Sequence, residues 1–234
     1  MNMTRMHHWT GTLLLVLAFA FSAYAQTTFG VKSGVAIQKV YTTEGLGAVA
    51  PNFQNLTEFQ FGVNADIPVF GALSFQPELL YTTKGFGLDQ GLEQELFGNQ
   101  IPLEAEAKSK FRYLEVPLLA KVSFGEADGP QAYFVAGPTF GYAVSGQLQT
   151  RARVLVSFDL PNVDINLDDI NYERLEIGAA VGAGVQLPVG PVKVFADARY
   201  QRGFTELYNI PLVEEKVRNT GVAISAGLAI PIGG

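Results

Sequence analysis

The feature that most constrains this chain is a series of long segments in which apolar and polar residues alternate with a period of two. Successive side chains of a β-strand point to opposite faces, so this alternation indicates strands with one apolar and one polar face. Phe59 and Phe61, for example, alternate with Gln60 and Gly62. The pattern predicts eight strands, over residues 29–38, 57–67, 73–84, 113–124, 134–145, 174–187, 192–201 and 221–232.

The lengths of these segments and of their connections indicate a membrane barrel. A strand of a soluble protein usually has about 5–6 residues, whereas a tilted strand that crosses a bilayer needs about 9–11. Short connections at 68–72, 125–130 and 188–191 alternate with long ones at 41–56, 86–109, 146–172 and 206–218. We therefore expect an all-β fold, an eight-stranded antiparallel transmembrane β-barrel of the outer membrane. A soluble lipocalin-like barrel would instead place its apolar face inside.

The polar face of these strands carries six basic and six acidic residues, and we expect it to line the barrel interior. Buried charges need partners, so the balance predicts a network of ion pairs. The expected members are Lys32, Glu58, Asp66, Glu78, Lys84, Glu115, Lys121, Arg174, Glu176, Lys193, Asp197 and Arg199. Such charges could relay protons or ions. The bore of an eight-stranded barrel is only wide enough for side chains, which favours a structural plug.

Tyrosines near the long-loop ends of the strands suggest an aromatic girdle at the membrane interface. They are Tyr41, Tyr81, Tyr113, Tyr142, Tyr172, Tyr200 and Tyr208.

Two of the long connections have patterns of their own. Residues 159–173 are acidic and could bind Ca²⁺, although they lack the ordered spacing of a calcium loop, and a solvated hairpin is favoured. Alternation around 154–158 and 163–167 predicts that the two flanking strands continue as a hairpin above the membrane, with an edge open to β-augmentation. Residues 86–109 are acidic with interspersed apolar residues, which fits either an amphipathic helix or an ordered surface loop.

The N-terminus has the features of a cleavable signal peptide over residues 1–25. Arg5 precedes an apolar core and a small-x-small motif, which predicts cleavage between Ala25 and Gln26 and a barrel domain over 26–234. Both histidines lie inside the predicted signal peptide, and the chain has no cysteine. Nucleophile–imidazole pairs and zinc sites are therefore excluded from the mature chain, and we expect no cofactor. The net charge of −6 also argues against a nucleic-acid partner, because proteins that bind nucleic acids carry basic patches.

Several motifs resemble those of the PorT-like outer-membrane barrel family of Bacteroidetes-type bacteria. They are the segments 75–81 with Lys84 and Gly85, 113–119 with Lys121, 136–138, and 198–200 with Gly203. The resemblance covers about residues 28–232 and implies residence in the outer membrane. For the namesake of the family it also implies a role in a multi-component protein secretion system.

The function that these observations favour is a non-enzymatic, structural or interaction component of the outer membrane. We expect it to sit in outer-membrane lipid and to contact periplasmic or secretion-system proteins through its long loops or its short turns. The alternative is a narrow porin-like channel or a small-solute binder.

Overall fold

A computed structural model describes residues 27–41, 52–96, 99–126, 128–153, 157–159, 161–170, 172–207 and 217–232. The predicted signal peptide, with Ala25 and Gln26, lies outside these ranges. No helix within them is long and apolar enough to cross a bilayer.

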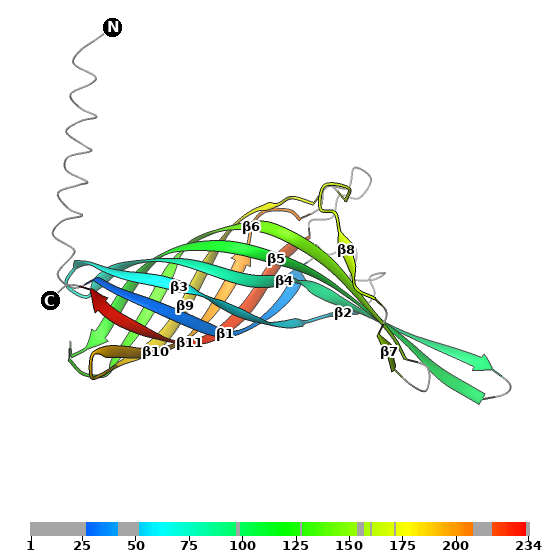
Figure 1. The fold of residues 1–234 in the computed structure, drawn as a ribbon, viewed down its shortest axis with the longest axis horizontal. Helices are drawn as coiled ribbons and strands as arrows, with labels where there is room; N and C mark the ends of the chain where they lie inside the picture. Colours follow the sequence, from blue (N-terminus) through cyan, green and yellow to red (C-terminus); the bar gives the residue numbers. More distant parts are fainter. Residues whose placement is uncertain are drawn as a thin grey trace, which may run out of the picture.

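Eight long strands form the wall of the molecule, and three short strands lie outside it (Figure 1). The long strands are β1 (Thr27–Tyr41), β3 (Leu56–Phe70), β4 (Leu73–Leu96), β5 (Asn99–Gly125), β6 (Gln131–Arg153), β9 (Leu175–Val189), β10 (Val192–Gly203) and β11 (Arg218–Ile232). The short strands are β2 (Asn52–Gln54), β7 (Ser157–Asp159) and β8 (Val163–Ile165).

The eight long strands close into a barrel. Each pairs antiparallel with the next in chain order, and β11 pairs with β1 from Thr27↔Ile232 to Tyr41↔Arg218. Every strand of the wall therefore has two neighbours, as the absence of water in a bilayer requires. The structure confirms the predicted eight-stranded antiparallel barrel.

The connections differ between the two ends of the barrel. The β3–β4, β5–β6 and β9–β10 connections are short, and we call the end where they lie the turn end. Gly71 and Gly190 sit in two of these turns with φ of 55° and 61°, a conformation that residues with a Cβ rarely adopt. The opposite end, with the long connections, is the loop end.

The alternation along the strands separates an apolar exterior from a polar interior, as β10 illustrates. Val194 and Tyr200 are exposed on the outer face, while Asp197, Arg199 and Gln201 are buried inside. On β3, Phe59 is 78% exposed and Gln60 is 3% exposed. This polarity is the reverse of a lipocalin and matches a wall that faces lipid.

Two expectations for the long connections differ from the structure. Residues 86–109 form neither a helix nor a loop, because β4 and β5 continue as one hairpin up to the pair Leu96↔Asn99. Beyond the barrel, β6 continues to Arg153, as expected, but β7 and β8 both pair with β6 rather than extending β9.

Candidate functional site: a filled bore

The centre of the bore is crossed by four charged side chains from three strands, which we call the central layer. Arg199 of β10 donates two parallel hydrogen bonds to Glu78 of β4, with Nη1–Oε2 and Nη2–Oε1 distances of 2.7 and 2.9 Å. Arg199 Nη2 also lies 2.8 Å from Asp197 Oδ2. Lys32 of β1 completes the layer, at 3.1 Å from Asp197 and 3.6 Å from Glu78.

The central layer is electrically neutral and shielded from water. Two cations face two carboxylates, and each of the four side chains is at most 2% exposed. Alternation explains why all four point into the bore, because each occupies an inward position of its strand, and the registers of the paired strands bring them to one level. Two parallel bonds between guanidinium and carboxylate fix both groups in one geometry. The central layer therefore acts as a rigid cross-brace between β1, β4 and β10.

A second charged layer lies nearer the loop end and is built around Lys84 of β4. Its Nζ lies 2.5 Å from Glu115 Oε2 and 2.7 Å from Glu176 Oε1. Gln201 donates to Glu115 at 2.8 Å, and Asn219 donates to Glu176 at 2.5 Å. Five strands (β4, β5, β9, β10 and β11) thus contribute one group each to this layer.

The interior nearest the turn end is occupied by Lys121 of β5. Its Nζ donates to Asp66 Oδ2 at 2.6 Å and to Gln186 Oε1 at 2.8 Å. The same ammonium lies 4.5 Å from the ring centroid of Tyr133, close enough for a cation–π contact. This group closes the bore below the central layer.

An apolar cluster closes the loop end. Phe111 and Tyr113 of β5 pack inside the mouth against Tyr172, Leu167 and Leu207, which come from the long connections. The rings of Phe111 and Tyr172 stack at 4.3 Å, and the Tyr113 and Tyr172 hydroxyls lie 2.5 Å apart. Backbone hydrogen bonds hold the cap, including Glu173 N to Leu207 O at 3.0 Å.

These layers fill the bore from the apolar cap at the loop end down to Lys121. Where the structure describes its lining, the bore contains two small cavities with volumes of about 10 Å³ and about 0 Å³. A cavity of roughly 10–15 Å³ holds a single water molecule, so neither could form part of a continuous water path. The interior therefore has the chemistry of a plug made of salt bridges and aromatic rings.

Comparison with known families decides the class of this barrel. A family model described as the outer membrane protein beta-barrel domain matches residues 4–209. The chain belongs to this family. It is an outer-membrane protein embedded in lipid. Short turns of such barrels face the periplasm and long loops face the exterior, so we assign the turn end to the periplasmic side.

Solved outer-membrane proteins resemble it at low identity. Neisserial surface protein A is 16% identical over 87% of this chain and 96% of that chain, with a TM-score of 0.41. Ail of Yersinia pestis is 12% identical over 88% and 99%, with a TM-score of 0.39. OprG of Pseudomonas aeruginosa is 11% identical over 91% and 99%, with a TM-score of 0.48. No curated protein matches the sequence.

The outer-membrane barrel brings nine of the twelve predicted interior charges together in the three groups described above, and the other three lie apart from them. Glu58 pairs with Lys110 at 2.5 Å near the loop end, and Lys193 lies half-buried at the turn end. Arg174 was expected inside, but it lies on the surface before β9 and pairs with Asp168 at 2.9 Å. The hydrogen bond from Arg174 to Asp168 raises the pKa of the guanidinium above its usual range.

The predicted tyrosine girdle divides between the two faces of the wall. Tyr142 and Tyr200 point outward, and the Tyr81 ring lies 5.3 Å from that of Phe61 on the outer face. Tyr113 and Tyr172 were wrongly placed in the girdle, because both are buried in the apolar cap. The Tyr41 side chain and Tyr208 lie outside the described residues.

The acidic connection 159–173 has an exposed surface where it is described. Asp164, Asp168 and Asp169 are exposed, and Asp168 is engaged by Arg174. Within the described residues, no three His, Cys, Asp or Glu side chains converge on a point where a metal ion could bind.

Sequence reasoning missed the uncharged members of the interior network. Gln76, Gln186, Gln201 and Asn219 each hydrogen-bond to an interior charge or to another amide. A count restricted to Asp, Glu, Lys and Arg could not find them. The signal was available nonetheless, because each occupies the inward phase of its strand.

Proposed function

We propose that this protein is a non-enzymatic and non-conducting outer-membrane component that contacts other proteins through a projection of its β-sheet. The filled bore is the observation that carries this proposal, because ion pairs and aromatic rings occupy the interior from the apolar cap to Lys121. The chain beyond residue 26 contains no His or Cys, so the common nucleophile–imidazole arrangements have no side chains to build them.

The projection consists of residues 85–96 of β4, 99–110 of β5 and 146–153 of β6, and we call it the β-extension. The β4–β5 ladder continues without a break from Gly85↔Lys110 to Leu96↔Asn99, well past the other barrel strands (Figure 1). At 3.4 Å per residue, this part of β4 is about 40 Å long. A paired sheet of that length forms a more rigid contact surface than a loop of equal size.

The edges of the β-extension support a particular mode of contact. In the described part of the chain, β2 covers only Gly87–Asp89 on the outer edge of β4. A row of backbone N–H and C=O groups on a sheet edge can accept a strand from another protein. We propose β-augmentation at this edge as the docking mode.

The resemblance to PorT-like barrels supports a more specific partner class. It implies participation in a protein secretion system, and we propose that partners of this barrel belong to such a system. The turn end would then offer a second contact surface in the periplasm.

The docking role is tested by removing most of the β-extension. Gly87 and Lys108 are direct cross-strand partners, so residues 88–107 can be replaced by an Asn-Gly turn without disturbing the wall. We expect the truncated barrel to keep its heat-modifiable gel mobility but to lose its protein crosslinks in native outer membranes.

A matched control carries the same Asn-Gly turn at the other end, as Gly190→Asn with Pro191→Gly. This variant should retain the crosslinks, because Gly190 already has the positive φ that Asn tolerates. Unchanged crosslinks in the truncated barrel would show that the β-extension is not the docking surface. Loss only in the control would assign docking to the turns.

The filled bore also predicts that the barrel does not conduct ions. Folded protein inserted into a planar bilayer should give no current steps above baseline, because the described part of the interior holds no continuous water path. A large porin inserted under the same conditions serves as the positive control. Reproducible steps from the folded form would favour the narrow-channel alternative.

A further inference from the structure

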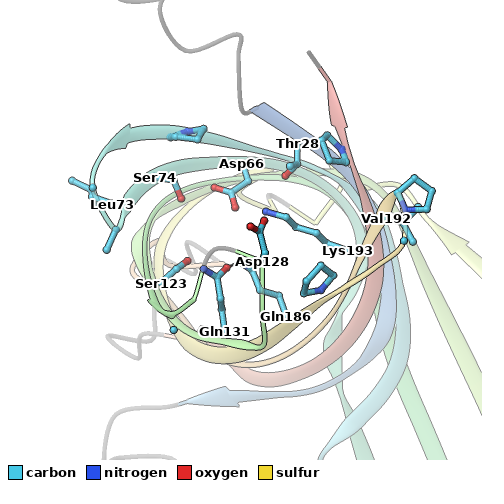
Figure 2. Close-up of a pocket in the computed structure, with 18 residues that line it drawn as sticks. Thr28, Asp66, Leu73, Ser74, Ser123, Asp128, Gln131, Gln186, Val192 and Lys193 are labelled. Carbon is cyan, nitrogen blue, oxygen red and sulfur yellow. Dashed lines mark hydrogen bonds between the residues drawn. The ribbon is translucent and has the colours of Figure 1, made fainter. Parts of the chain in front are cut away.

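The bore widens at the turn end into a cavity of about 660 Å³, which we call the vestibule. Asp66, Ser74, Asp128, Gln131, Gln186 and Lys193 are among the residues that line it. Figure 2 shows these polar side chains around one shared space. Small-molecule sites commonly have volumes of about 300–1,000 Å³. The vestibule is a cup rather than a passage, because Lys121, Asp66 and Gln186 close its floor.

Two buried oxygen atoms in the floor lack a hydrogen-bond donor. They are Asn64 Oδ1 and Asp66 Oδ1, neither of which has a partner among the described residues. Asn64 is only 6% exposed, and the other oxygen of Asp66 is bound by Lys121. A buried acceptor without a donor is costly, so this place suits a group that carries N–H or O–H bonds.

The space beside these oxygens is small. Asn64 and Asp66 both line an inner cavity of about 10 Å³, which shares Thr28, Asp66, Gln186 and Lys193 with the vestibule. That volume is about the size of one water molecule, and an ammonium group is of similar size. Because Lys121 and Gln186 close the floor, the end of a ligand reaches this space only when these side chains move aside, and the rest of the ligand remains in the vestibule.

Lys193 provides a positive charge that can pair with an anionic group of a ligand. Its side chain lines both cavities, and it forms no ion pair with a carboxylate of the described residues. Near the floor, the charges of Lys121 and Asp66 cancel, and Lys193 and Asp128 both point into the vestibule (Figure 2). The four charges sum to zero.

This arrangement discriminates between classes of solute. A purely cationic ligand could donate to Asn64 and Asp66, but it would make no use of Lys193 and would add positive charge to a neutral site. A purely anionic ligand could pair with Lys193 but would leave Asn64 and Asp66 without donors. A zwitterion satisfies both sides and adds no net charge to a neutral site.

We propose that the vestibule binds the main-chain ammonium and carboxylate groups of a free α-amino acid from the periplasm. The ammonium group donates to Asn64 Oδ1 and Asp66 Oδ1, and the carboxylate pairs with Lys193. The side chain of the amino acid occupies the wider part of the vestibule. This binding site lies at the opposite end from the β-extension and does not depend on the docking role.

Calorimetric titration of the folded full-length barrel in detergent tests the proposal with defined probes. Because recognition is through the main-chain groups, glycine, L-alanine and L-glutamine should all bind at millimolar or lower concentrations. L-alanine methyl ester and N-acetyl-L-alanine should each bind at least about tenfold more weakly, since each lacks one charge-assisted contact. No binding by any of the three amino acids, or equal binding by the ester, would overturn the proposal.

Two variants test the carboxylate contact and the ammonium contact separately. Lys193→Gln should weaken L-alanine about tenfold while leaving the methyl ester unchanged. Asn64→Leu should weaken both but leave N-acetyl-L-alanine unchanged. Lys39→Gln, on the exposed face of β1, is the matched control and should bind as the parent does.

Gel mobility before and after boiling reports whether each variant folds. If Asn64→Leu fails to fold, Lys193→Gln with the alanine and ester pair still decides the question. Undiminished L-alanine binding by folded Lys193→Gln would refute the assignment. In that case water is the group that the floor oxygens bind.

Discussion

Replacement of Arg199 by leucine is expected to lower the free energy of unfolding of the barrel by about 3–5 kcal/mol. This is the usual loss of stability when one partner of a buried ion pair is removed. The substitution deletes both bonds to Glu78 and the contact with Asp197. Two carboxylates would then share Lys32, which lies 3.6 Å from Glu78. Urea unfolding in lipid vesicles, followed by tryptic digestion or gel mobility, measures the change.

A double variant tests whether this loss of stability arises because Glu78 is left buried without its partner. Arg199→Leu combined with Glu78→Leu removes the whole bidentate pair and leaves Lys32 with Asp197 at 3.1 Å. Replacing both partners of a buried pair is often nearly neutral, so we expect most of the lost stability to return. Arg174→Leu is the control, and it should have no measurable effect because the Arg174–Asp168 pair is exposed. Equal losses in the single and double variants would contradict this interpretation.

The barrel itself could be predicted from the sequence because lipid forces the alternation to be visible. Within the membrane, outward residues such as Phe59 and Val194 must be apolar, while inward ones such as Gln60 and Asp197 can be polar. Each wall strand therefore displays a period of two. The same phase also indicates which charges meet inside, since Lys32, Glu78 and Arg199 all occupy inward positions.

The β-extension was not predicted in this way, and the reason is physical. Above the membrane both faces of a hairpin can be polar, so the strict alternation of β4 ends near residue 88. It returns only in β5, where Ile101 and Leu103 are followed by alanines at 105 and 107. An acidic segment with scattered apolar residues fits an amphipathic helix or a surface loop equally well, and the sequence pattern therefore leaves both open.

Arg174 and Tyr113 show two further limits of predictions made from the period-two alternation. Arg174 continues the inward phase of β9, but the strand begins at Leu175, so the residue lies outside the bore. Tyr113 shares the inward face of Glu115, and it remains there because Tyr172 and Leu207 build an apolar pocket inside the mouth. Those partners are 59 or more residues away in the chain, beyond the reach of any local pattern.

The second large effect is expected at Gly34, in the seam where the first and last strands close the barrel. A Cβ atom on Gly34 would overlap the carbonyl oxygen of Ile224 and lie 2.6 Å from Ser225 Cα, both of which belong to the β11 backbone. Backbone atoms in a paired strand cannot move aside without breaking the ladder. We expect Gly34→Ala to cost about 3 kcal/mol or more in the same urea assay, the upper range for overpacking.

Gly141→Ala provides the matched comparison within the same wall. Its added Cβ would meet the Tyr113 ring at 3.2 Å, and a side chain can shift by a few tenths of an ångström. The alanine also reduces the entropy of the unfolded chain, so the net change should stay within about 1 kcal/mol. A similar loss at both glycines would mean that the wall tolerates no added carbon anywhere. A large loss at Gly34 alone would instead show that the tight contact between β1 and β11 closes the barrel.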